Sequence, residues 1–158
     1  MDAQAFKDSV TDRINSACEL YVKDLEALDE PKLGQTPGGV ARAPYDFTYE
    51  VVFVNRRVTK RLRGEVPEPF EFDGWMKAPE EFRTKSAAVS ALKESCNEVL
   101  EAWKALPAED MGKTIVLGDG SESNPLKMAN LCATHLVYHD AQLNYIQSLC
   151  GDDEMHWG

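Results

Sequence analysis

Two histidines in the last helical segment carry the clearest chemistry in this sequence. His135 and His139 are four residues apart, and the chain has only three histidines in all. Residues four apart lie one above the other on the same face of a helix, with Cβ atoms roughly 5–6 Å apart. Two imidazoles placed in this way can share one metal ion at about 2.0–2.1 Å each. The pair therefore predicts a metal site, with two hydrogen-bonded core histidines as the alternative.

Apolar periodicity places both histidines on the inward side of this helix. Steps of four and three residues connect the predicted inward stripe, which consists of Met128, Cys132, His135, His139, Gln142, Ile146 and Leu149. Two buried imidazoles need separate hydrogen-bond partners, whereas one metal ion satisfies both, so the metal is favoured. The segment is not the helix of a zincin metalloprotease, because Leu136 rather than glutamate follows the first histidine.

A metal needs a third protein ligand, and Glu50 in the second helical segment is the candidate. It follows Phe47 by three residues, so it faces the edge of the core in an otherwise aromatic and apolar stretch. A carboxylate in such a position is costly unless it is paired or bound to a metal. The alternative is an ion pair with Arg57, further along the same helix. Cys132 is a weaker ligand candidate, because small inward cysteines usually only pack.

Two further residues are candidates for substrate binding. Arg57 lies on the side of Glu50 and could receive an anionic substrate or a thiol cofactor. The alternative is a solvated basic face at the helix end, where positive charge also favours the helix dipole. Gln142, one turn past His139, could orient a ligand or a bound water, with core hydrogen bonding as its alternative role.

Four amphipathic segments must position these residues. Their approximate ranges are 3–28, 44–63, 84–106 and 125–149. In each segment apolar residues recur at intervals of three and four, as in an amphipathic helix. Dense β-branched residues make a strand at 51–54 a rival interpretation, but the helical spacing continues beyond it. Four helices with one apolar stripe each predict an all-α chain that folds as a four-helix bundle, with residues 1–158 as a single domain.

The connections between the helices differ in character. The crossover between the second and third helices, residues 65–83, is rich in proline and contains the aromatic residues Phe70, Phe72 and Trp75. Aromatic side chains need a surface to pack on, so we expect this crossover to be ordered. After the third helix, residues 114–117 and the glycine-containing turn at 118–120 predict a short extended segment with a tight turn.

Composition excludes several classes of partner. The 158 residues include 17 basic and 27 acidic side chains, which gives a net charge of −10. This charge disfavours nucleic acid and anionic membrane surfaces as partners. No apolar run is long enough to cross a bilayer, and the first residues do not resemble a signal peptide. The four cysteines are widely spaced, so we expect free thiols and a cytoplasmic protein.

Two of these segments resemble the DinB/YfiT-like superfamily of metal-dependent helix-bundle proteins. The stretch from His135 to Leu143 is similar to that family's His-x-x-x-His-x-x-Gln segment. The second helix also resembles it, in Tyr45–Val52 and in Val54–Arg57. The order of elements agrees along essentially the whole chain. The resemblance implies an up-down-down-up bundle with a long crossover between the second and third helices.

The same resemblance implies a three-ligand site for a divalent ion such as nickel, zinc or manganese. Characterised relatives include transferases and isomerases that use low-molecular-weight thiols such as bacillithiol or mycothiol. The family usually has a third histidine on the second helix, whereas the matching position here is Glu50. Glutamate is also a metal ligand, so the site can persist with a preference for harder ions and one more negative charge.

Three hypotheses about function follow. In the first, Glu50, His135 and His139 hold a divalent ion in a hydrolase or a thiol S-transferase that acts on a small-molecule substrate. In the second, the same site binds metal without turnover, as in a stress-related protein. In the third, the histidines belong to the core and a helix face forms an interaction surface. A homodimer is expected from the resemblance.

Overall fold

Four long helices account for the fold over the residues that the structure describes, 2–71 and 73–156. In this computed structural model they are α1 (Ala3–Ala27), α3 (Pro44–Leu62), α4 (Lys85–Ala105) and α5 (Pro125–Leu149). Each predicted helix is present, with ends within a residue or so of those expected from the sequence. The all-α four-helix bundle is therefore confirmed, and the rival strand at 51–54 lies inside α3.

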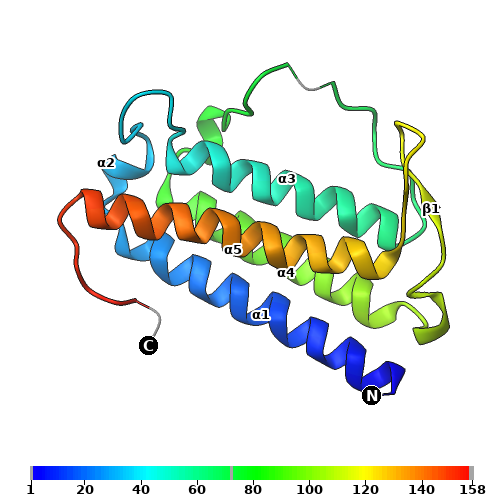
Figure 1. Cartoon of the computed structure of the whole chain (residues 1–158). Helices are drawn as coiled ribbons and strands as arrows, with labels where there is room; N and C mark the ends of the chain where they lie inside the picture. The colour runs from blue at the N-terminus through cyan, green and yellow to red at the C-terminus, as the bar shows by residue number, and fades with distance from the viewer. Residues whose placement is uncertain (1, 72, 157–158) are drawn as a thin grey trace.

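The helices run up, down, down and up, as expected. Figure 1 shows α1 and α5 pointing in one direction and α3 and α4 in the other. Both α4 and α5 pack against α1 and also against α3, so the helices do not follow chain order around the bundle. The crossover after α3 returns along the whole bundle before α4 begins (Figure 1). This arrangement makes α3 and α5 antiparallel neighbours, and these two helices carry the predicted metal ligands.

Local sequence signals define the helix ends. The side chains of Asp2, Thr84 and Asn124 each accept a hydrogen bond from a backbone N–H in the first turn of α1, α4 and α5. Gly64 follows α3 with φ of 78°, and Gly151 follows α5 with φ of 88°. Only glycine adopts this left-handed conformation without strain, and it closes both helices with a Schellman pattern of backbone hydrogen bonds.

The shorter elements lie in the connections. A four-residue helix, α2 (Glu30–Leu33), follows α1 and was not expected from the sequence. Single 3₁₀ turns occur at Glu80–Phe82 and Ala108–Asp110. The predicted extended segment is present as β1 (Ile115–Val116), which pairs antiparallel with β2 (Glu122–Ser123), so that Ile115 lies opposite Ser123.

Aromatic contacts hold the crossover against the bundle, as predicted. Phe70 packs on Phe53 of α3, with ring centroids 4.6 Å apart. Trp75 lies over the guanidinium group of Arg42, 5.0 Å from its Cζ atom to the ring centroid. Phe72, the remaining aromatic residue named above for this segment, lies outside the described residues.

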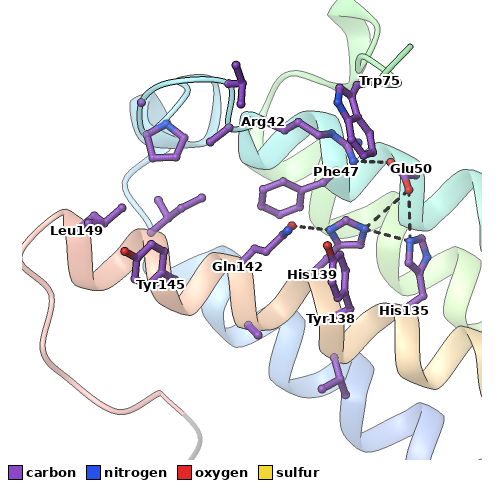
Figure 2. Close-up of a pocket in the computed structure, with 17 residues that line it drawn as sticks. Arg42, Phe47, Glu50, Trp75, His135, Tyr138, His139, Gln142, Tyr145 and Leu149 are labelled. Carbon is purple, nitrogen blue, oxygen red and sulfur yellow. Dashed lines mark hydrogen bonds and ion pairs between the residues drawn. The ribbon is translucent and has the colours of Figure 1, made fainter. Parts of the chain in front are cut away.

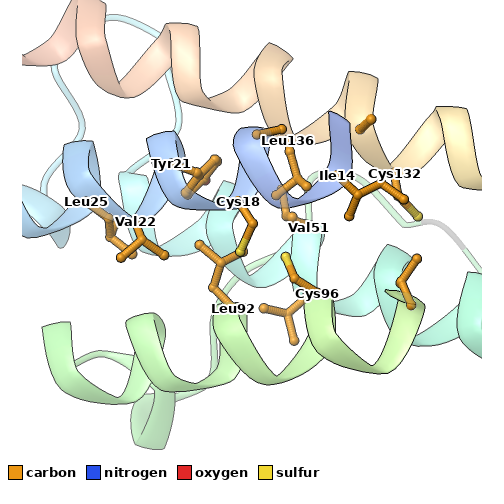
Figure 3. Close-up of a cluster of buried hydrophobic side chains, with 14 of the residues drawn as sticks. Ile14, Cys18, Tyr21, Val22, Leu25, Val51, Leu92, Cys96, Cys132 and Leu136 are labelled. Atoms are coloured by element: carbon orange, nitrogen blue, oxygen red, sulfur yellow. The ribbon is translucent and has the colours of Figure 1, made fainter. Parts of the chain in front are cut away.

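The core contains apolar side chains from all four long helices. Figure 3 shows Ile14 and Tyr21 of α1, Val51 of α3, Leu92 of α4 and Leu136 of α5, all fully buried. Burying an aliphatic or aromatic side chain of this size contributes about 1.5–3 kcal/mol. Burial on this scale fixes the two helices that hold the candidate site.

The buried stripe of α5 differs in part from the predicted stripe. Leu136 and Leu143 are fully buried, whereas Leu149 is 56% exposed, which corrects its predicted inward position. The physical reason is that α5 packs against α1 and α3 around Leu136 and Leu143, whereas Leu149 in its last turn lines an open cavity. His139 stays buried, and His135 lies at the edge of the core towards α3.

Cysteines and helix hydropathy are consistent with the expectations from composition. Cys18, Cys96 and Cys132 are buried, Cys150 is exposed, and all are free thiols. Within residues 2–71 and 73–156, no helix combines the length and the apolar character that a membrane crossing requires.

Candidate metal centre

Helices α3 and α5 bring the three predicted metal ligands together. The Nε2 atoms of His135 and His139 are 3.0 Å apart. The Oε1 atom of Glu50 lies 3.5 Å from the first of these nitrogens and 3.9 Å from the second. Figure 2 shows the carboxylate pointing from α3 towards both imidazoles. All three potential ligand atoms lie within 4.8 Å of one another, so one ion could contact all of them.

The spacing of these atoms fits a metal ion of ordinary size. Ligand atoms bound to one tetrahedral ion at about 2.0–2.1 Å are separated from each other by about 3.3 Å. The separations of 3.0, 3.5 and 3.9 Å lie close to this value. Two imidazoles and one carboxylate suit zinc, nickel or manganese, and three protein ligands leave at least one position open.

The histidines are in the protonation state that a metal requires. Burial lowers the pKa of His139 to about 4 and also lowers the pKa of His135, so both imidazoles are neutral near pH 7. The Nδ1 atom of His139 donates to Gln142 Oε1 at 2.8 Å, which leaves the Nε2 lone pair directed at the site. Phe47 of α3 stacks on the same imidazole, with centroids 5.2 Å apart.

Glu50 forms an ion pair with Arg42. The Nη1 atom of Arg42 is 2.6 Å from Glu50 Oε2, which leaves Oε1 facing the histidines. Arg42 also donates to the backbone oxygen of Asp46 at 3.2 Å. The alternative pairing of Glu50 with Arg57 is therefore wrong. The reason is tertiary, because the connector before α3 folds back over the helix and places Arg42 beside Glu50.

Arg57 lies away from the three ligands. Seven residues separate it from Glu50, a distance of about 10 Å along the helix axis. Its Nη1 atom donates to the backbone oxygen of Glu68 at 2.6 Å, and its guanidinium lies over Phe53. Arg57 lines a different cavity, near the hairpin, with a volume of about 690 Å³. The structure therefore does not bring this predicted substrate-binding residue to the candidate metal centre.

The structure places Gln142 at the candidate site and Cys132 in the core. Gln142 contacts His139 and lines the cavity beside the three ligands, so it lies where the sequence placed an orienting residue. Cys132 is fully buried in the core, and burial raises the pKa of its thiol to about 12. It does not belong to the group of three potential ligands, so the interpretation of Cys132 as a packing residue fits the structure.

A large cavity opens beside the three ligands. Its volume is about 940 Å³, and its walls come from α5, the start of α3, the connector before α3 and the crossover. Arg42, Trp75 and Tyr138 line it and were not identified from the sequence as site residues. The sequence could have identified Phe47 as a site residue, since its three-residue spacing places it on the same helix face as Glu50. Arg42 and Trp75 had none, because only the tertiary path of their loops brings them here.

A buried acidic pair lies on the other side of α5. Asp140 follows His139 in sequence but lies beside Asp24 of α1, and both side chains are buried. The two oxygens of Asp24 have no hydrogen-bond partner among the described residues. Burial raises the pKa of Asp140 to about 7, and the charge of Asp24 acts in the same direction.

Comparison with known proteins identifies the family. The family model of the DinB superfamily matches residues 19–143, and the chain belongs to this superfamily. The resemblance seen in the sequence is thereby confirmed. A solved structure of a conserved protein from Enterococcus faecalis is similar, with a TM-score of 0.72 and 14% identity, over 90% of this chain and 95% of that chain. At this identity the likeness concerns the fold. A comparison with curated proteins gives no match.

The acidic pair formed by Asp24 and Asp140 predicts that the free energy of unfolding of the protein falls as the pH rises towards the pKa of Asp140 and beyond it. An aspartate carboxyl ordinarily has a pKa of 3.8, and in the fold the pKa of Asp140 is about 7. Between these two values the native protein retains a proton that the unfolded chain has lost. In metal-free protein, Asp140→Asn should therefore raise the free energy of unfolding, with a gain about 2 kcal/mol larger at pH 8 than at pH 5.

Urea unfolding at the two pH values measures this difference. Asp12→Asn, which changes an exposed aspartate of the α1 helix that also contains Asp24, is the control for the removal of one carboxyl group. An equal effect of Asp140→Asn at both pH values would show that the carboxyl titrates normally.

Proposed function

We propose that this protein binds a divalent metal ion through Glu50, His135 and His139 and uses it in enzymatic transfer chemistry. The convergence of these three side chains at the inner end of an open cavity supports the proposal most directly. Membership of the DinB superfamily supports it independently. The preferred reaction is a thiol S-transfer, in which a low-molecular-weight thiol attacks an electrophilic small molecule. Hydrolysis is the second candidate.

The chemistry of such a site follows from its ligands. A divalent ion held there would lower the pKa of a thiol or water in its open position and so supply a nucleophile near pH 7. Gln142 keeps His139 in the tautomer whose Nε2 faces the ion. Arg42 holds one oxygen of Glu50, which directs the other oxygen towards the histidines. Phe47 is buried and stacks on His139, which keeps water away from that face of the imidazole.

The size of the cavity is compatible with a thiol as co-substrate. About 940 Å³ is far more space than a hydrolytic water needs, and it suits two organic reactants or one large one. A protein that only binds metal would use the same three ligands, and it differs from the enzyme in turnover alone. We include a homodimer and a cytoplasmic location in the proposal as expectations carried over from the sequence.

Metal content tests the proposed ligands. Protein purified without an affinity tag and offered zinc, nickel or manganese should contain close to one ion per chain by elemental analysis. His135→Ala and Glu50→Gln should each lose it, because two remaining ligands bind weakly. His156→Ala removes the one histidine outside the site, which pairs with Asp152, and should retain the metal. A wild type without metal, or full retention in both ligand variants, would contradict the proposal.

The contact between Gln142 and His139 predicts a graded effect on affinity. Gln142→Leu removes the acceptor for Nδ1 and should weaken zinc binding by roughly 10–100-fold. Gln142→Glu keeps an acceptor at the same position and should retain most of the affinity. Competition with a chromophoric chelator measures both. Equal loss in the two variants would show that the hydrogen bond to His139 is not the cause.

A further inference from the structure

We propose that the substrate bound in this cavity is an amphipathic monocarboxylate. Its carboxylate lies between the metal site and Arg42, and its apolar body extends along α5 towards Leu149. The inference rests on the proposed function, because it places the head group beside the metal. It adds the chemical class of the molecule that the cavity accepts.

The charges of the cavity lie at one end. Among the described residues that line it, Arg42 and Glu50 are the only charged side chains, and the two histidines are neutral. The single charges of Arg42 and Glu50 cancel, so a bound divalent ion leaves this end with a net charge of about +2. In a half-buried site, a charge of this sign favours an anionic ligand. A cationic head group is disfavoured for the same reason.

Arg42 is placed to receive that anion. Its side chain is 15% exposed and lines the cavity, and the ring of Trp75, which also lines it, covers the guanidinium. Its Nε–H has no hydrogen-bond partner among the described residues. A metal ion that draws Glu50 towards the histidines would also weaken the hold of Glu50 on Nη1. The guanidinium would then have donors free for a carboxylate, the group that its planar geometry matches best.

The rest of the cavity is apolar and unusually exposed. Tyr138, Tyr145 and Leu149 of α5 are 60%, 67% and 56% exposed, and Trp75 is 66% exposed across from them. Figure 2 shows Tyr145 and Leu149 following Gln142 along the helix, away from the three ligands. Large apolar side chains gathered around one opening mark a binding surface. Their position next to the charged end indicates a ligand with a polar head and an apolar body.

The length of this apolar wall sets the length of the ligand. Ten residues separate His139 from Leu149, which is about 15 Å along a helix. A straight-chain or aryl-alkyl body of roughly 10–15 Å would cover this stretch. The volume of about 940 Å³ lies near the upper end of the range for small-molecule sites.

Calorimetric titration of the zinc-loaded protein tests the proposal with butanoate, hexanoate, octanoate, dodecanoate and octylammonium as probes. Affinity should rise about fourfold for each added methylene, as expected when each is buried. Octylammonium, which has the same body with the opposite charge, should not bind measurably.

Two pairs of variants test separately the binding of the carboxylate and the binding of the apolar chain of the ligand. Arg42→Gln should weaken octanoate binding by about tenfold or more, whereas Arg42→Lys should retain part of it. Leu149→Ser should weaken dodecanoate, whose chain is long enough to reach this residue, but leave butanoate unchanged. The control is Leu131→Ser, which alters an exposed leucine of the same helix outside the cavity and should change neither. Zinc content and far-ultraviolet circular dichroism verify that each variant is folded and loaded.

The outcomes distinguish this proposal from the proposed function. Full zinc content without octanoate binding overturns the substrate class alone. Failure to load zinc at all overturns the metal-dependent function and this inference with it. Equal binding of octanoate and octylammonium, or no dependence on chain length, also overturns the inference. So does a Leu149→Ser variant that alters only self-association in sedimentation, since the apolar wall would then be an interface between copies of the chain.

Discussion

A half-buried carboxylate at the contact between α3 and α5 is the constraint on which the rest of the site depends. Glu50 cannot lie against an aromatic face without compensation, because an unpaired charge there is strongly destabilising. Arg42 supplies that compensation through its ion pair with one oxygen, and the neutral imidazoles of His135 and His139 lie near the other oxygen. The bundle tolerates the charge only because the connector and two different helices converge on it.

The topology explains why these groups meet. The up-down-down-up order makes α3 and α5 antiparallel neighbours, so the face that contains Phe47 and Glu50 lies against the histidine face of α5 (Figures 1 and 2). The long crossover that this order requires brings Trp75 to the cavity, beside Arg42 (Figure 2). A sequential up-down-up-down bundle would need no such segment. The path that sets the helix order thus also supplies one wall of the cavity.

Local patterns in the sequence predicted the helices and the three residues that the structure brings together as potential ligands, because both depend on short-range periodicity. The four-residue step between His135 and His139 and the three-residue step from Phe47 to Glu50 are preserved in any helix. Arg42 could not be predicted in the same way, since its position depends on how the connector folds back. The inward position expected for Leu149 was wrong because the periodicity of one helix cannot show where the core ends and an open cavity begins. The alternative pairing of Glu50 with Arg57 was wrong because the carboxylate of Glu50 forms its ion pair with Arg42.

The position of a bound ion tests the central claim most directly. Crystals of the zinc-loaded protein, measured on both sides of the zinc absorption edge, would locate the metal by its anomalous scattering without reference to any assumed ligand. The account predicts a single strong peak within about 2.0–2.2 Å of Nε2 of His135, Nε2 of His139 and a carboxylate oxygen of Glu50. A peak elsewhere, or a peak bound by the histidines while Glu50 remains paired only with Arg42, would contradict it.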